Sequence, residues 1–196
     1  KNALIKAGLS ENLRRRSKHI VLTNNSLTIH ESLSGTGAHL VSIAFVYKIA
    51  AEIGSLGDNM AFIRTQIKND LILRLLCQYK FEANSITAHT RWASVGDINT
   101  ANCHPHDNTP ADTSISKTGI IHVCLNGDID NYRDLKIEYE ANYDKIHPEI
   151  NSDTKLIPLQ IEHYIKQGNT LEEAFKLALN DFEGSHAISM HSDLDP

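Results

Sequence analysis

The chain has 196 residues, of which 41% are hydrophobic and 22% are charged, so it can bury a sizeable core and is not expected to be disordered. Its 19 basic and 24 acidic side chains give a formal net charge of -5, and the basic residues are dispersed apart from residues 14–16, which argues against a nucleic-acid partner. The most apolar stretch, residues 40–47, is far shorter than the roughly 20 residues that span a bilayer, so no membrane partner is expected.

The first half of the chain predicts three helices, with a β-hairpin between the first and the second. Leucines at helical spacing predict a helix over residues 3–16. Two strand-like runs, residues 19–23 and 26–30, flank an Asn-Asn pair and predict a β-hairpin. Residues 40–53 and 58–79 are predicted to be helices. The second has an apolar stripe that we expect to face the core, formed by Met60, Ile63, Ile67, Leu71 and Leu75.

The second half predicts strands at both ends of an irregular stretch, followed by two helices and a last strand. The strands are expected at residues 86–93 and 119–125, and the segment between them is rich in Asn, His, Asp, Thr and Pro. A helix is predicted from residue 152 to about residue 166, and a capping box predicts another over residues 170–182. A strand is predicted at residues 185–191. This mixture favours an α+β fold over a regular alternation of strands and helices.

The cysteines and the N-terminal residues indicate a cytoplasmic protein. Cys77, Cys103 and Cys124 are odd in number and show no C-x-x-C spacing, so neither a disulfide framework nor a zinc ribbon is expected. Residues 1–6 are not followed by the apolar run and small-residue cleavage site of a secretory signal.

Four segments of the second half form a specific pattern. Residues 89–96 are H-T-R-W-A-S-V-G, and residues 102–106 are N-C-H-P-H. Residues 125–132 are L-N-G-D-I-D-N-Y, and residues 152–157 are S-D-T-K-L-I. In identity and order these segments resemble the glutaminase domain of class II glutamine amidotransferases of the glucosamine-6-phosphate synthase type. The resemblance covers roughly residues 86–191, a little over half of the chain.

This resemblance implies an N-terminal-nucleophile hydrolase fold, a four-layer αββα sandwich of two stacked antiparallel sheets flanked by helices. It implies hydrolysis of glutamine to glutamate and ammonia, with the ammonia transferred to a sugar phosphate such as fructose 6-phosphate. We therefore expect a single glutamine amidotransferase domain over residues 1–196, part of a longer synthase with a C-terminal synthase/isomerase domain. No cofactor is implied, and homodimerisation is left open.

The N-terminus departs from the family pattern. In that family the first residue of the mature chain is a cysteine, whose thiolate attacks the glutamine amide while its own α-amino group acts as base. This sequence begins with Lys1, so we expect a fold that is incomplete at the N-terminus and a nucleophile outside the sequence. Either the start was trimmed, or the domain is a catalytically inactive pseudo-glutaminase that binds glutamine as a sensor or scaffold. An amidotransferase with another acceptor is a third alternative.

The resemblance assigns Asn126 and Gly127 to an oxyanion hole, where a side-chain amide and a backbone N–H face the oxygen that becomes negative. The structural alternative for this pair is an ordinary Asn-Gly turn. Trp92 is expected to wall the pocket, and Ser94 stands where the family has a threonine that touches the substrate. Val95 stands where the family has a histidine, which weakens assignment to the synthase itself.

Arg91 and Asp153 match the residues that hold the two charged groups of glutamine. A guanidinium can grip a carboxylate through two parallel hydrogen bonds, and the carboxylate of Asp153 would hold the α-ammonium. The structural alternatives are an ion pair for Arg91 and helix capping beside Ser152 for Asp153. Because one glutamine must touch all of them, we expect Arg91, Asn126 and Asp153 to converge on one cleft.

Two other patterns are weaker candidates for chemistry. Residues 103–107, C-H-P-H-D, contain good zinc ligands, but no second ligand cluster lies elsewhere in the sequence, so no metal is expected. His122 and Cys124 share one face of a predicted strand without the third group that orients a Cys-His nucleophile.

Overall fold

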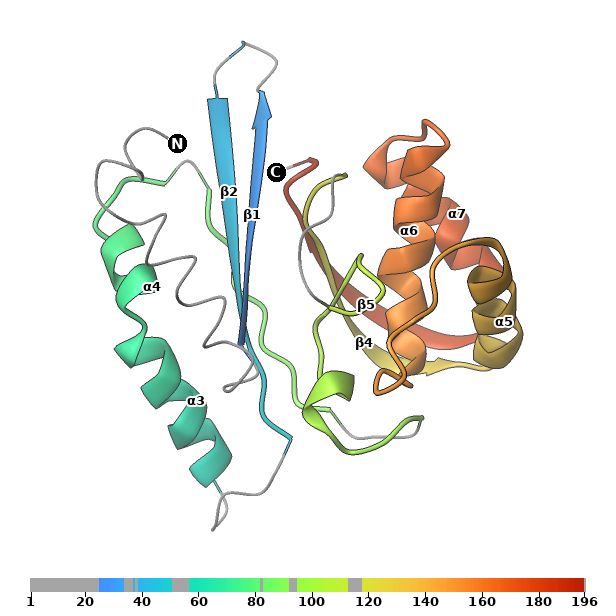
Figure 1. The fold of residues 1–196 in the computed structure, drawn as a ribbon, viewed down its shortest axis with the longest axis horizontal. Coiled ribbons are helices and arrows are strands. Elements are labelled where there is room, and N and C mark those ends of the chain that lie inside the picture. The colour runs from blue at the N-terminus through green and yellow to red at the C-terminus, as the bar shows by residue number, and fades with distance from the viewer. Residues whose placement is uncertain are drawn as a thin grey trace. The chain divides into compact units, whose positions relative to one another are not determined.

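The computed structural model of the protein divides the chain into two compact units, Lys1–Asn84 and Ser85–Pro196, which are taken in turn. It describes residues 25–33, 37, 39–50, 57–81, 83–91, 95–112 and 118–195. Within these residues, five α-helices and two antiparallel sheets form an α+β fold, as predicted (Figure 1). No helix among them is both long enough and apolar enough to cross a bilayer.

The first unit contains a β-hairpin and two helices. β1 (Asn25–Leu33) pairs antiparallel with β2 (His39–Tyr47), and α3 (Asp58–Asn69) and α4 (Leu71–Leu76) follow. Apolar side chains of α4 pack on one face of β2. This contact is made by Ile72, Leu76, Ile43 and Phe45.

β2 corrects the helix predicted over residues 40–53. Its sequence is rich in β-branched and aromatic residues, which lose rotamer freedom in a helix and pack well on a pleated surface. β1 confirms the strand predicted at residues 26–30, and its described partner is β2. The helix predicted over residues 3–16 and the strand predicted over residues 19–23 lie outside the described residues.

The single helix predicted over residues 58–79 is broken at Asp70. The Asp70 carboxylate accepts hydrogen bonds from the amides of Ile72 and Leu73 at 3.0 and 2.9 Å, so it caps a new helix. The break changes the helical phase, which buries Ile72 in place of the predicted stripe. The stripe residues exposed to solvent are Met60, Ile67, Leu71 and Leu75.

The second unit is built on a three-stranded antiparallel sheet. β3 (His106–Asp107), β4 (Ile121–Ile129) and β5 (Gly184–Ser192) lie in the order β3-β4-β5. The two long strands confirm those predicted at residues 119–125 and 185–191. β4 is the central strand, so both of its edges are paired within the sheet.

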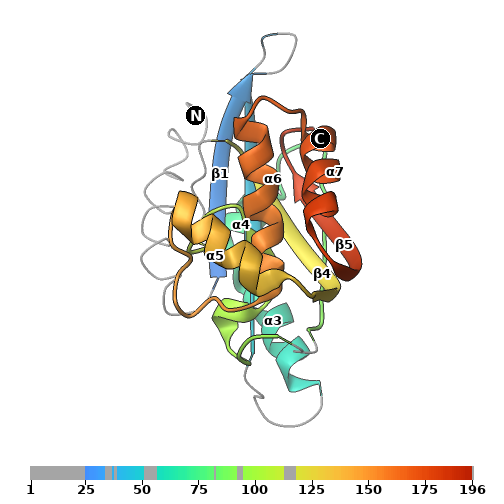
Figure 2. The same ribbon diagram turned by 90° about the vertical axis from the view of Figure 1, so that its right-hand side faces the viewer.

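Helices α5 (Tyr132–Asn142), α6 (Leu156–Lys166) and α7 (Leu171–Asp181) complete the second unit. A 3₁₀ turn, η2 (Asp153–Lys155), leads into α6. The predicted capping box is present at the start of α7. The helices predicted from residues 152 and 170 are therefore confirmed, and Figure 2 shows α6 and α7 lying over β4 and β5.

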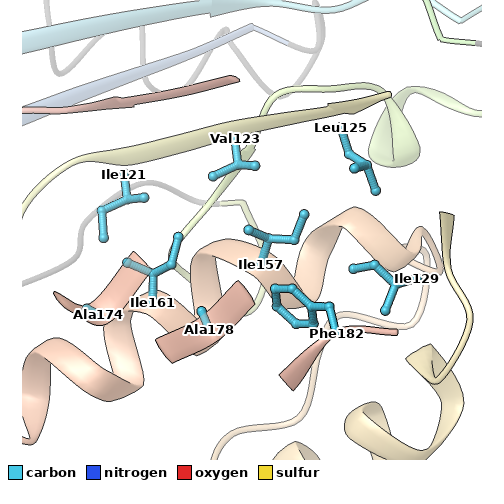
Figure 3. Close-up of a cluster of buried hydrophobic side chains, with 9 residues drawn as sticks. All are labelled: Ile121, Val123, Leu125, Ile129, Ile157, Ile161, Ala174, Ala178 and Phe182. Atoms are coloured by element: carbon cyan, nitrogen blue, oxygen red, sulfur yellow. The ribbon is translucent and has the colours of Figure 1, made fainter. Parts of the chain in front are cut away.

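The core of the second unit lies between one face of β4 and the two helices. Alternate residues of β4 point at this layer, which is the period expected of a strand (Figure 3). Two small residues of α7 let that helix approach closely. The buried set is Ile121, Val123, Leu125, Ile129, Ile157, Ile161, Ala174, Ala178 and Phe182. Each large aliphatic side chain buried here contributes roughly 1.5–3 kcal/mol.

The segment that precedes this sheet is not the buried strand predicted over residues 86–93. Residues 86–91 do not form a strand, and Ile86 is 92% exposed. Ser85 and Thr87 instead contact the ring of His191 on β5, at 2.7 Å for Ser85. Residues 86–91 contain one large aliphatic side chain, so they offer little apolar surface with which to hold a strand in the sheet.

A buried lysine joins the loop after β3 to the start of α6. The ammonium of Lys155, 1% exposed, donates to the Asp107 carbonyl at 2.6 Å and pairs with the Asp112 carboxylate at 2.7 Å. Asp112 also contacts the His106 ring at 2.7 Å. Burial raises the pKa of Asp107, whereas the Lys155 charge acts in the opposite direction. This network therefore depends on the lysine charge.

Replacing this lysine should destabilise the protein. Lys155→Met removes the cation and leaves buried carboxylates uncompensated, so we expect the free energy of unfolding to fall by about 3–5 kcal/mol in urea denaturation. The control is Lys176→Met, which breaks the exposed Lys176–Glu172 pair and should leave the midpoint unchanged. Equal midpoints for the two variants would contradict a stabilising role for the buried ammonium.

Candidate active site

Asn126 and Gly127 lie inside β4, opposite Ala187 and His186 of β5, and do not form the Asn-Gly turn that was the structural alternative. Gly127 has φ of 140°, and a Cβ there would lie 1.9 Å from the Ser185 carbonyl oxygen. Only glycine fits so close an approach of the two strands. Asn126 is out of phase with the core residues of β4, so its side chain belongs to the opposite face of the sheet.

Arg91 lies in the irregular segment before the sheet and is half-buried. Its guanidinium donates to the carbonyls of Val95 and Asp97, the latter at 3.4 Å. Among the described residues no carboxylate forms an ion pair with it. The ion-pair alternative therefore finds no support there, and the planar group keeps donors for a further acceptor.

Asp153 opens η2 and is 4% exposed. One carboxylate oxygen accepts from the Ile129 amide at 3.0 Å, and the other accepts from the Thr154 amide at 2.8 Å. Asp153 thus ties the end of β4 to the start of α6, while Ser152 makes no side-chain cap. No cation of the described chain pairs with this carboxylate, although a buried charge is costly unless it is compensated.

These four residues line one pocket. Arg91, Asn126, Gly127 and Asp153 line a small, partly open cavity of about 80 Å³, below the roughly 300–1,000 Å³ that is usual for small-molecule sites. The other lining residues are His89, Thr90, His104, Leu125 and Thr154. The structure therefore brings together four of the six predicted site residues, and their binding roles stay predictions. Trp92 and Ser94 lie outside the described residues.

Two histidines of this pocket were not among the predicted site residues. His89 and His104 stack with ring centroids 4.4 Å apart, and His104 accepts from the Leu125 amide at 3.4 Å. Burial, and secondarily the nearby Arg91 charge, lowers the pKa of His89, while a hydrogen bond to the Leu125 backbone acts against them. The lowered pKa favours the neutral form of the His89 imidazole. The sequence signal that could have identified His89 as a pocket residue is its position two residues before Arg91.

The C-H-P-H-D segment has structural partners. The Cys103 thiol contacts the Asn99 carbonyl at 3.5 Å, and the Asp107 carboxylate accepts from the Thr109 amide at 2.7 Å. In the part of the chain that the structure describes, no group of three His, Cys, Asp or Glu side chains is arranged to hold a metal ion.

Comparisons with known proteins find relatives that are named as aminotransferases. No family model matches the chain. It is 37% identical over 109 residues to the glutamine–fructose-6-phosphate aminotransferase (isomerizing) of Sulfurisphaera tokodaii, which covers 56% of this chain and 17% of that protein. Proteins of the same name match from Listeria innocua, with 39% identity over 107 residues, 55% of this chain and 16% of theirs, and from Bacillus subtilis, with 32% over 118 residues, 60% and 18%.

The chain thus spans less than a fifth of the length of these relatives, and the similarity covers little more than half of the chain itself. Within that range the similarity agrees with the resemblance seen in the sequence motifs.

The close approach of β5 to Gly127 can be tested by comparison with a second glycine of positive φ that has no neighbouring atoms where a Cβ would lie. Gly168 also has positive φ, 97°, and a Cβ there meets nothing within 4 Å. Gly168→Ala should lower the free energy of unfolding by about 1–2 kcal/mol, the strain of a left-handed residue. Gly127→Ala adds a clash with β5 and should cost more in the same urea titration. Equal losses would show that the close approach at Gly127 does not matter.

Proposed function

We propose that this pocket binds L-glutamine and that the protein is the glutaminase domain of a glutamine amidotransferase, which hydrolyses glutamine to glutamate and ammonia for transfer to a sugar phosphate such as fructose 6-phosphate. The observation that carries the proposal is the pair of opposite charges in one pocket. Arg91 has no carboxylate partner among the described residues, and Asp153 is a buried carboxylate with no cation there.

These charges match the head group of a free amino acid. The α-carboxylate would receive hydrogen bonds from the Arg91 guanidinium, and the α-ammonium would compensate the Asp153 carboxylate. A glutamine inside a peptide has neither charged group on its α-carbon, so this clamp discriminates against it. The similarity to glutamine–fructose-6-phosphate aminotransferases supports glutamine among the amino acids.

The side-chain amide of the bound glutamine would then lie at β4. A nucleophile adds to the amide carbon, and the carbonyl oxygen becomes an oxyanion that the Asn126 side-chain amide and the Gly127 N–H would stabilise. The α-amino base would pass the proton that it took from the thiol to the leaving nitrogen, which departs as ammonia as the C–N bond breaks. Water would then hydrolyse the thioester, which releases glutamate and restores the thiol. The nucleophile that the resemblance implies is the thiolate of an N-terminal cysteine, and we assign it to no residue of this sequence.

The remaining expectations belong to the same proposal. They are the αββα sandwich, a single domain over residues 1–196, a C-terminal synthase/isomerase domain, homodimerisation and a cytoplasmic location. Trp92 would wall the pocket, and Ser94 would touch the substrate. Val95, where the family has a histidine, keeps another ammonia acceptor open as the alternative.

A second function is a glutamine-binding module without hydrolysis. It requires no nucleophile, and the three internal cysteines offer none at the pocket, since Cys77 is exposed at the end of α4, Cys103 bonds to a loop carbonyl, and Cys124 is buried in β4. None of them is among the residues that line the pocket. Such a module would bind glutamine through Arg91 and Asp153 and act as a sensor or a scaffold.

Isothermal titration of L-glutamine into the protein tests the binding site. Arg91→Ala and Asp153→Asn should each weaken binding about 10- to 150-fold, because each removes a charged hydrogen bond worth about 1.5–3 kcal/mol. Arg133→Ala and Asp134→Asn on exposed positions of α5 are matched controls and should bind like the wild type. N-acetyl-L-glutamine amide, which lacks both charged groups, should not bind. Wild-type affinity in the Asp153→Asn variant would rule out the clamp.

Ammonia release by the product of the whole gene separates the two functions. The glutaminase predicts release from L-glutamine that falls in the Arg91→Ala variant. A protein that binds L-glutamine tightly and releases no ammonia would support the binding module in its place.

A further inference from the structure

The two charged residues of the pocket come from segments far apart in the sequence, so their separation must be set by other groups. Asn102 connects these segments. It is the last residue of a 3₁₀ turn, η1 (Thr100–Asn102), and its side chain is fully buried, with 0% exposure. A buried amide must satisfy both its donor and its acceptor. In Asn102 the oxygen bonds to the segment before Asp153, and the nitrogen bonds both to that segment and to the loop that holds Arg91.

The nitrogen end of the Asn102 amide bonds to the loop that holds Arg91. Asn102 Nδ2 donates to the Asp97 carbonyl at 3.1 Å, and Arg91 Nη1 donates to the same oxygen at 3.4 Å. The guanidinium and the Asn102 side-chain amide therefore share one acceptor, the Asp97 carbonyl oxygen. Moving this carbonyl would move the donors of Arg91.

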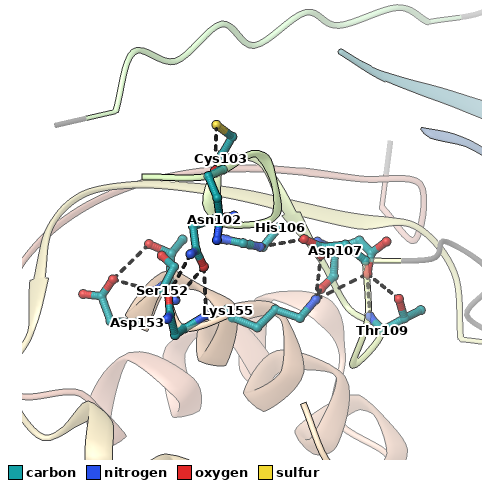
Figure 4. A network of polar contacts seen from close by, with 12 residues as sticks. Asn102, Cys103, His106, Asp107, Thr109, Ser152, Asp153 and Lys155 are labelled. Carbon is teal, nitrogen blue, oxygen red and sulfur yellow. Dashed lines mark hydrogen bonds and ion pairs between the residues drawn. The ribbon is translucent and has the colours of Figure 1, made fainter. Parts of the chain in front are cut away.

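The oxygen end bonds to the backbone that leads into Asp153. Asn102 Oδ1 accepts from the amides of Asn151 and Ser152 at 2.8 and 3.1 Å. Figure 4 shows these contacts beside the Asp153 carboxylate. Both amides immediately precede Asp153, so the position of η2 depends on this acceptor.

Asn151 strengthens the same connection. Its side-chain oxygen accepts from Asn102 Nδ2 at 2.6 Å and from the Asp97 amide at 2.9 Å, and its Nδ2 donates to the Asp97 carboxylate at 2.9 Å. Gly96 lies against it, because a Cβ at Gly96 would be 2.7 Å from Asn151 Oδ1. Gly96 and Asp97, two consecutive residues of the loop that holds Arg91, thus lie against Asn151 in the segment that holds Asp153.

We propose that Asn102 is a positioning residue that sets the separation between the Arg91 guanidinium and the Asp153 carboxylate, an inference that rests on the proposed glutamine site. The two ends of its amide differ in what they hold. The oxygen holds the Asp153 segment through two backbone amides, and the nitrogen joins the Arg91 loop to Asn151. Asn102→Asp keeps the acceptor for these two amides and loses the donor to the Asp97 carbonyl and Asn151 Oδ1, so it should release the Arg91 loop while the Asp153 segment stays held.

Three probes resolve the two ends in a titration of the 196-residue protein. They are L-glutamine, 4-carbamoylbutanoate, which lacks the α-ammonium, and 4-aminobutanamide, which lacks the α-carboxylate. Asn102→Asp should weaken L-glutamine and 4-carbamoylbutanoate by about tenfold or more, the effect of one lost charged hydrogen bond, and leave 4-aminobutanamide unchanged. Equal weakening of all three probes, or no weakening of any, would overturn the proposal.

Asn99→Asp is the matched control. It places the same charge in the same loop, and its side-chain oxygen still accepts from the Asn102 amide, a contact of 2.9 Å in the wild type. All three affinities should be unchanged.

A ligand-free measurement separates this proposal from the proposed function. In NMR spectra of Asn102→Asp, the Arg91 Nε–Hε signal should shift or broaden, while the amide signals of Ile129 and Thr154, which bond to Asp153, stay in place. If the wild type binds no L-glutamine but this pattern appears, the glutamine site fails and the positioning role stands. If the wild type binds L-glutamine and the Arg91 signal is unchanged, the positioning role fails.

Discussion

The Asp153 carboxylate is the group on which the organisation of the pocket depends. By accepting the Ile129 amide it joins the end of the central strand to the beginning of α6, and by lining the pocket it places a negative charge where a ligand would bind. It is almost fully buried and has no cationic partner among the described residues. Two backbone amides and the Thr154 hydroxyl donate hydrogen bonds to its oxygens, but a cation compensates its charge better than neutral donors do. An α-ammonium group at this position, as in the proposed glutamine complex, would supply that cation.

A second constraint is the backbone of β4 at Gly127. The same strand buries Val123 and Leu125 against α6 and α7 on one face, and its residues of opposite phase belong to the other face. β4 thus contributes to both the core and the pocket, and Leu125 belongs to both. Substitutions that loosen the β4–β5 pairing should consequently affect the stability of the core and the geometry of the pocket together.

The parts of the fold that the sequence predicted are those governed by local rules. The capping box at Thr170 needs only a hydroxyl and a carboxylate three residues apart, and it is formed as predicted. The sequence also predicted a strand over residues 119–125, and β4 buries all of its first five residues. Local rules failed where composition was ambiguous: residues 40–47 were read as a helix because apolar runs of that length suit either structure, and Asp70 was not recognised as a cap inside a helical pattern.

The candidate site shows the same division. The motifs predicted Arg91, Asn126, Gly127 and Asp153, and all four line the pocket. The groups that support them act over long sequence separations and were not predicted. Lys155 reads as a solvated residue at a helix start, because lysine is almost never buried unless it is paired, and its carboxylate partners lie more than 40 residues earlier. Asn102 likewise reads as a loop residue, although both ends of its amide are used.

The most direct test of the account is a crystal structure of the protein grown with L-glutamine. The account predicts one glutamine in the pocket, with its α-carboxylate within about 3 Å of the Arg91 guanidinium, its α-ammonium at the same range from Asp153, and its amide oxygen facing Asn126. A glutamine bound elsewhere, or bound in this pocket with its α-ammonium away from Asp153, would contradict it.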